Sequence, residues 1–147
     1  CRLFHLIHPQ LAFFGEKDFQ QLTIIKKMVQ DLFMPVMIIG CPIVREQSGL
    51  ALSSRNQYLS KQKQQQAAQL YQTLTLVKKA FQDGITTSKD LLDIVHSALN
   101  NTVFTLDYVA IVDETTLDPI QDTVTPGNRI LIAATIEKTR LIDNLSL

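Results

Sequence analysis

The chain has 147 residues, of which 46% are hydrophobic and 19% charged, so it can bury a core and is not globally disordered. Lys plus Arg and Asp plus Glu both number 14, which excludes a basic excess of the kind that binds nucleic acid or an anionic membrane. No apolar run reaches the ~20 residues needed to span a bilayer, and the two cysteines lack metal-ligand spacing, so we expect a reduced, cytoplasmic protein without a metal site of its own.

The first part of the chain predicts a parallel βαβ unit. Residues 11–14 are an apolar run typical of a fully buried strand, and residues 36–39 are a second such run closed by Gly40. Between them, apolar side chains recur at three- and four-residue steps from Phe19 to Leu32, the pattern of an amphipathic helix. A strand, a helix and a strand in this order form a right-handed parallel unit.

The opening of the chain is informative as well. Cys1 leads directly into the apolar residues 3–7, which resemble the end of a helix. A natural terminus is more often polar and loosely held, so we expect a piece of a longer protein. Because a βαβ unit is not a whole sheet, we also expect the missing strands to lie upstream of Cys1.

Beyond Pro42 the pattern changes to that of a small α+β domain. Ser60 is predicted to cap one long helix that ends at Asp83-Gly84, and Ser88 to cap a shorter helix. Strands are then predicted over three ranges, with a turn at residues 125–128 after the first: 108–112, 129–136 and 140–142. Helices followed by strands favour an antiparallel sheet, and we place the domain boundary near residues 42–45.

The first candidate site is Gly15-Glu16-Lys17-Asp18, between the first strand and the helix. Ligands of open α/β sheets bind at the carboxyl ends of strands, and a helix start attracts phosphate. Gly15 permits close approach to the backbone, Lys17 adds a positive charge, and Asp18 could hold a ribose hydroxyl or a water of Mg²⁺. The alternative is a capping box, with Asp18 as N-cap and Gln21 as its partner. The pattern leaves both interpretations open, and they are compatible.

The second candidate site is the loop from Leu50 to Asn56, which contains two adjacent hydroxyls and a guanidinium, at Ser53, Ser54 and Arg55. These groups could wrap a triphosphate and stabilise charge that develops during transfer. The alternative is a turn in which Ser53 or Ser54 caps a short helix, and the pattern alone favours it.

The remaining polar residues are interpreted as structural. The histidines lack metal or triad spacing: His5, His8 and His96. Three aspartates flank the predicted strands and are interpreted as strand-end residues: Asp107, Asp113 and Asp143. Lys78-Lys79 is interpreted as a solvated helix face. The chain has neither a P-loop nor a G-x-G-x-x-G motif.

Taken together, the two candidate sites resemble the pantothenate synthetase (pantoate–β-alanine ligase) family. The resemblance is carried by F-G-E-K-D-F-Q-Q from Phe14, V-R-E from Val44, G-L-A-L-S-S-R-N from Gly49 and R-L-I-D-N from Arg140. It covers essentially the whole chain. The first and third strings, in this order and spacing, are highly specific.

The resemblance implies a fold and an assembly. Residues 1–44 would be the end of a Rossmann-like parallel sheet of the nucleotidylyltransferase (HUP-type) superfamily, which binds ATP and pantoate. Residues 45–147 would be a small α+β lid domain with an antiparallel sheet. The family also implies a homodimer when the protein is full length.

The resemblance also implies roles for individual residues. One segment would contact ATP, with Lys17 on the phosphates: Gly15, Glu16, Lys17 and Asp18. Gln21 would bind pantoate, and Val44 would contact the adenine region through its backbone. A second segment resembles the K-M-S-K-S loop that grips a triphosphate: Leu52, Ser53, Ser54 and Arg55.

The implied reaction joins pantoate to β-alanine with Mg·ATP, through a pantoyl-adenylate, and releases pyrophosphate and AMP. The family's H-x-G-H-type motif and first pantoate glutamine belong to its N-terminal half and do not occur in this chain, so we expect the chain by itself to be inactive. Two alternatives are another acid-adenylating nucleotidylyltransferase and a non-catalytic dimerisation module.

Overall fold

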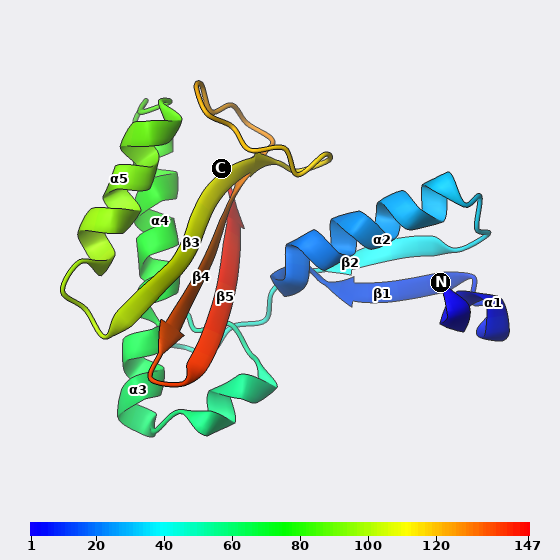
Figure 1. The fold of residues 1–147 in the computed structure, drawn as a ribbon, viewed down its shortest axis with the longest axis horizontal. Coiled ribbons are helices and arrows are strands. Elements are labelled where there is room, and N and C mark those ends of the chain that lie inside the picture. The colour runs from blue at the N-terminus through cyan, green and yellow to red at the C-terminus, as the bar shows by residue number, and fades with distance from the viewer. The chain divides into compact units, whose positions relative to one another are not determined.

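The computed structural model describes residues 1–147 and divides them into two compact units, Cys1–Ile43 and Val44–Leu147 (Figure 1). Each unit has its own sheet, one of two strands and one of three. No helix in either unit combines the length and apolar character needed to cross a membrane.

The first unit is the predicted parallel βαβ arrangement, preceded by a short helix. Its elements are α1 (Arg2–Ile7), β1 (Leu11–Gly15), the 3-10 turn η1 (Glu16–Asp18), α2 (Phe19–Asp31) and β2 (Met37–Cys41). β1 and β2 pair in parallel along their whole length, and α2 packs against both strands. The predicted fold class of this part is confirmed.

The prediction that both strands are fully buried is wrong. Leu11, Phe13 and Met37 are 49%, 64% and 61% exposed. Within this chain β1 and β2 are each other's only strand partners. Successive side chains of a strand point to opposite faces, and α2 covers one face of this sheet, so alternate side chains remain open to solvent.

Gly40 was predicted to close the second strand, but it lies within β2, opposite Phe14. A Cβ atom at this position would lie 3.1 Å from Leu22 Cδ2 and 3.2 Å from Glu16 Oε1. The absence of a side chain therefore lets α2 and the turn before it pack closely on the strand.

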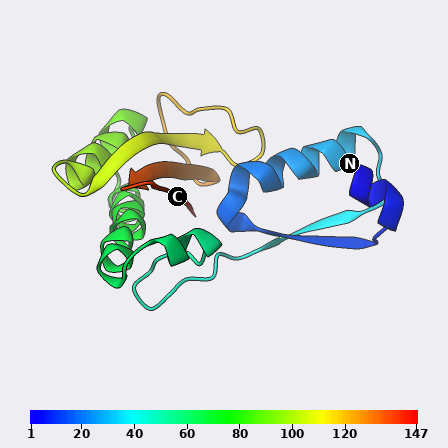
Figure 2. The same cartoon turned by 60° about the horizontal axis from the view of Figure 1, so that its bottom comes forward.

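The second unit is a helical layer on an antiparallel sheet (Figures 1 and 2). Its helical elements are η2 (Ser54–Tyr58), α3 (Lys61–Ala67), α4 (Gln69–Gln82) and α5 (Ser88–Leu99). The strands β3 (Phe104–Asp113), β4 (Asn128–Ile136) and β5 (Thr139–Ser146) are arranged with β4 in the centre. This confirms the predicted small α+β domain with an antiparallel sheet.

The core of the second unit lies between β4 and the helices α4 and α5. Its fully buried side chains include Leu70, Leu74, Val77, Leu91, Val95, Ile130, Ile132 and Ile136. Each such burial contributes about 1.5–3 kcal/mol before entropy is counted, so this cluster is the main source of stability in the unit.

The prediction of a single long helix after Ser60 is wrong, because the structure has two helices, α3 and α4, with Ala68 between them. Ser60 does cap α3, since its Oγ accepts a hydrogen bond from Lys63 N at 3.3 Å. The predicted end is confirmed: Gly84 has φ 102°, and the Gly84 and Ile85 amides donate to the carbonyls of Phe81 and Ala80.

The predicted cap of α5 is also wrong. Thr87 occupies the N-cap position, and Ser88 is the first residue of the helix. Ser88 is buried, and its Oγ donates to the carbonyl of Ile120 at 2.7 Å. The hydroxyl is therefore used by a loop that is distant in sequence.

Candidate functional site

The first candidate segment lies at the carboxyl end of β1. Gly15 is the last residue of the strand, and nothing lies within 4 Å of where its Cβ would be, so its backbone is open to close approach. Glu16, Lys17 and Asp18 form the turn η1 that leads into α2. Glu16 and Lys17 are half-buried, whereas Asp18 is exposed.

The capping-box prediction for this segment is wrong. Asp18 occupies the N-cap position of α2, but its side chain makes no capping hydrogen bond. Its backbone, at φ −92° and ψ 59°, lies outside the extended region because residues 16–18 already turn as a 3-10 helix. Gln21 is exposed in the first turn of α2. Neither side chain is therefore used to cap the helix.

The second candidate segment begins with a short hairpin over residues 44–52. The amide of Leu52 donates to Val44 O at 2.9 Å, and the amide of Glu46 donates to Leu50 O at 2.9 Å. The turn is completed at Gly49, whose φ is +94°. A Cβ on Gly49 would lie only 2.6 Å from the ring of Tyr71. Glycine is therefore required here both by the positive φ and by the close approach of Tyr71.

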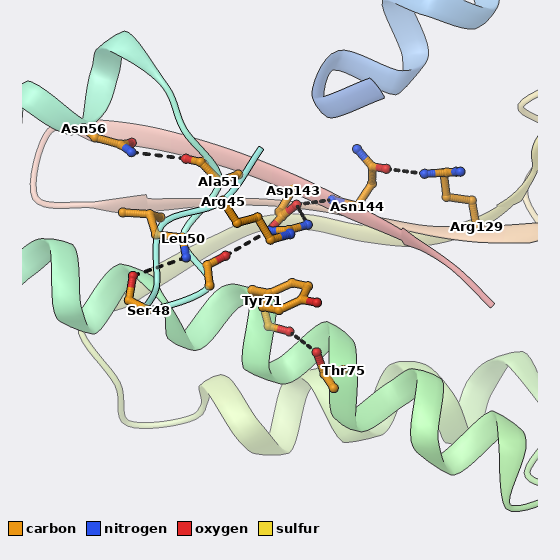
Figure 3. A network of polar contacts seen from close by, with 11 residues as sticks. Arg45, Ser48, Leu50, Ala51, Asn56, Tyr71, Thr75, Arg129, Asp143 and Asn144 are labelled. Atoms are coloured by element: carbon orange, nitrogen blue, oxygen red, sulfur yellow. Dashed lines mark hydrogen bonds and ion pairs between the residues drawn. The ribbon is translucent and has the colours of Figure 1, made fainter. Parts of the chain in front are cut away.

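The side chain of Arg45 joins this hairpin to β5 and α4 (Figure 3). Its Nη1 and Nη2 atoms donate to the two carboxylate oxygens of Asp143 at 2.7 and 2.8 Å, and Nη1 also donates to Gly49 O at 3.0 Å. The guanidinium carbon lies 3.8 Å from the centre of the Tyr71 ring. Asp143 is only 5% exposed and the Arg45 side chain 16%, so this ion pair is largely buried.

The predicted triphosphate segment follows the hairpin directly. Ser53 Oγ accepts a hydrogen bond from Arg55 N at 3.2 Å and caps the short helix η2, so the capping alternative for Ser53 is confirmed. Leu52, Ser54 and Arg55 are exposed. Arg55 faces an open groove that it shares with Tyr58 and with the turn between β4 and β5.

Asn56 fixes the far side of this segment. It is 6% exposed, and its Nδ2 donates to Ala51 O at 3.1 Å (Figure 3). Gln64 Nε2 donates to Asn56 O at 2.9 Å and to Leu59 O at 3.2 Å. Residues 53–55, of which Ser54 and Arg55 are exposed and Ser53 is half-buried, are therefore a segment whose two flanks are both held by the body of the unit.

Sequence reasoning missed the role of Asp143, which is not a strand-end residue. β5 continues to Ser146 instead of ending at Ile142, so Asp143 lies within it, two residues after the buried Leu141. A period of two places both side chains on the same face, and a carboxylate on a buried face requires a cation. That signal was present in the R-L-I-D-N string.

Two other structural interpretations are corrected. Asp107 lies within β3 and accepts a hydrogen bond from Arg140 Nε at 2.7 Å, so it is not a strand-end residue. Lys78 is only half exposed, because its Nζ donates to the carbonyl of Ser146 at 2.7 Å. Both contacts join residues that are far apart along the chain, which local patterns do not reveal.

Comparison with known proteins gives a consistent result. A family profile described as pantoate-beta-alanine ligase matches residues 1–146. A pantothenate synthetase of Clostridium botulinum is 46% identical over 150 residues, which cover 99% of this chain and 52% of that protein. A bifunctional pantoate ligase/cytidylate kinase of Nostoc sp. is 46% identical over 144 residues, which cover 97% of this chain and 27% of that protein.

Solved structures show the same similarity. The pantothenate synthetase of Thermus thermophilus matches with a TM-score of 0.89 at 45% identity, covering 99% of this chain and 52% of that one. The pantoate-beta-alanine ligase of Francisella tularensis, complexed with beta-gamma ATP and beta-alanine, matches with a TM-score of 0.67 at 32% identity. That match covers 99% of this chain and 46% of the other. The chain thus spans about half the length of the pantothenate synthetases it matches.

Proposed function

The chain belongs to the pantoate–β-alanine ligase family, and from this we propose that the protein containing it condenses pantoate with β-alanine at the expense of ATP. The structural observation that supports this most is that Ser54 and Arg55 are exposed on a segment, residues 53–55, whose two flanks are held by hydrogen bonds. A hydroxyl pair and a guanidinium on a fixed base suit the stabilisation of a triphosphate. In this proposal residues 1–44 belong to the ATP- and pantoate-binding domain, and residues 45–147 form the lid.

The first step of the proposed reaction forms an adenylate. A carboxylate oxygen of pantoate attacks the α-phosphorus of ATP, and the bond from that phosphorus to the bridging oxygen breaks. Pyrophosphate leaves with the electron pair. Lys17, Ser53, Ser54 and Arg55 are proposed to donate hydrogen bonds to the triphosphate, and the cations Lys17 and Arg55 also to neutralise its growing charge. Gln21 is proposed to hold pantoate, and the Val44 backbone to contact the adenine.

The second step forms the amide. The amine of β-alanine attacks the acyl carbon of pantoyl-adenylate, AMP leaves with the electron pair of the broken carbon–oxygen bond, and the amine loses a proton. The Francisella tularensis relative was solved with beta-gamma ATP and beta-alanine, which supports these substrates. Mg²⁺ is proposed to arrive bound to ATP, and the exposed carboxylate of Asp18 would hold one of its waters or a ribose hydroxyl. A homodimer in the cytoplasm is part of the same proposal.

The assignment of Lys17 and Arg55 is tested by alanine substitution in the natural protein that contains this sequence. Removal of one charged contact to a transferring phosphoryl group typically costs about 10²–10³-fold in rate. We expect the rate of pantoate-dependent exchange between ATP and pyrophosphate to fall by about this factor in each variant. The free energy of unfolding should be unchanged.

Lys26→Ala is the matched control, because Lys26 is an exposed lysine of α2 in the same unit as Lys17. It should leave exchange unaltered. Near-normal exchange by Lys17→Ala or Arg55→Ala would refute the role of that residue. Exchange that depends on a carboxylic acid other than pantoate would refute the substrate and favour another acid-adenylating enzyme.

A further inference from the structure

The geometry points to Arg45 as a positioning residue that holds residues 53–55 in the shape required by the triphosphate. This inference rests on the proposed function of that segment. It adds a residue that contacts neither ATP nor pantoate in the proposal and acts through the backbone of the hairpin.

Arg45 joins three parts of the second unit at one point. Its guanidinium donates to the Gly49 carbonyl within the hairpin, to both carboxylate oxygens of Asp143 on β5, and lies over the Tyr71 ring on α4. A planar fork with several donors makes these contacts simultaneously, whereas a lysine ammonium is a point charge without the plane or the fork. The site therefore uses the geometry of arginine as well as its charge.

Stability alone does not explain this arrangement. A buried ion pair contributes little net stability, because desolvation offsets the attraction, and its best-attested use is to specify one geometry. An apolar residue pair of similar volume could fill the same space without this desolvation cost. An ion pair that fixes the register of the hairpin over residues 44–52 is expected where the following residues, 53–55, must be positioned accurately.

A short path of contacts connects Arg45 to the exposed segment. Arg45 pairs with Ala51 in an antiparallel bridge, and Ala51 O accepts the hydrogen bond from Asn56 Nδ2. Ala51 precedes residues 53–55 and Asn56 follows them. Both flanks of the segment are therefore connected, through Ala51, to the hairpin strand that contains Arg45. Misplacement of a catalytic group by about 1 Å can cost about 10²-fold in rate.

The test is Arg45→Lys in the natural protein that contains this sequence, assayed by pantoate-dependent ATP–pyrophosphate exchange. We expect kcat/KM for ATP to fall about 10-fold or more, with the KM for pantoate changed by less than about 2-fold. Arg129→Lys is the matched control, since Arg129 is a buried arginine that is ion-paired to Glu114 at 2.9 Å and donates to Asn144 at 2.6 Å, next to Asp143 but outside the hairpin. It should lower the melting temperature comparably and leave kcat/KM for ATP within about 2-fold.

A double-substitution cycle distinguishes positioning from a general structural role. If Arg45 acts by placing Arg55, Arg45→Lys should cost less than about 2-fold when Arg55→Ala is already present. Equal losses with and without Arg55→Ala would overturn the inference, as would normal kcat/KM for ATP in Arg45→Lys.

Two further measurements keep the inference testable on its own. If Arg45→Lys does not fold, Asp143→Asn is the second variant, because asparagine retains the shape of the side chain and one acceptor oxygen. It should show the same selective fall in kcat/KM for ATP. If the unmodified protein shows no exchange, the proposed function fails, and calorimetric titration with Mg·ATP tests the positioning directly. Weaker binding by Arg45→Lys than by Arg129→Lys would then support it, and equal binding would overturn it.

Discussion

Two glycines of the second unit share a backbone conformation but differ in their surroundings. Gly49 and Gly127 have φ of +94° and +95°, a region that other residues rarely adopt. A Cβ on Gly127 would meet nothing within 4 Å, whereas a Cβ on Gly49 would lie 2.6 Å from the Tyr71 ring. The pair therefore separates the cost of backbone strain from the cost of a side-chain clash.

We expect Gly49→Ala to destabilise the protein by about 2–4 kcal/mol and Gly127→Ala by about 1 kcal/mol. The difference is the displacement of Tyr71, which also supports the Arg45 guanidinium. Urea unfolding of the two variants measures both values. Equal losses would show that the Tyr71 contact is relieved without cost.

At the scale of single elements, the end of β3 depends on one carboxylate. Asp113 Oδ1 accepts hydrogen bonds from the amides of Thr115 and Thr116 at 2.8 and 2.9 Å, and these bonds lower the pKa of the Asp113 carboxyl. The same turn brings Leu117 N to Asp113 O at 3.0 Å. Asp113 is thus the strand-end residue that the sequence predicted, with a defined capping role.

This gives a prediction about pH. Since the pKa of Asp113 is lowered in the folded state, its contribution to stability is present above the unfolded pKa and is lost as the pH falls through the folded pKa. The loss of unfolding free energy in Asp113→Asn should therefore be larger at about pH 7 than at about pH 3. Urea midpoints at the two pH values provide the measurement. A difference that does not vary with pH would contradict the role of the charge.

At the scale of the whole molecule, the two units differ in how much core they contain. Among the buried hydrophobic residues, only Phe19 and Leu22 lie in the first unit. The second unit contains the continuous cluster around β4. Cooperative stability follows buried apolar contact, so the units should open independently.

We expect hydrogen exchange of the 147-residue chain to be slowest in β4 and much faster in β1 and β2. β4 lies in the centre of its sheet, between β3, which α5 contacts, and β5, which α4 contacts, whereas β1 and β2 each have one partner strand. Mass spectrometry of exchanged peptides resolves the two units. Equal protection in both would mean that they unfold as one cooperative body.

Much of this protein could be predicted from periodicity and turn chemistry. The strand, helix and strand of the first unit, the Gly84 helix end and the turn before Asn128 all follow from residues close together in sequence. The strings at Phe14 and Gly49 also identified the family, which the profile and the relatives confirm. These features depend on neighbours within a few residues, so the sequence alone carries them.

The remainder was decided by contacts between distant residues. Ser88 was predicted to cap its own helix but donates to Ile120, and Asp143 was predicted to end a strand but binds Arg45, 98 residues away. A local pattern records the period of a strand or helix and the polarity of each face, but not which side chain of another element meets that face. The sequence therefore determined the type and order of most elements and the two candidate segments. Only the tertiary structure decided how the second segment is held, because a buried carboxylate must find its cation wherever the fold places one.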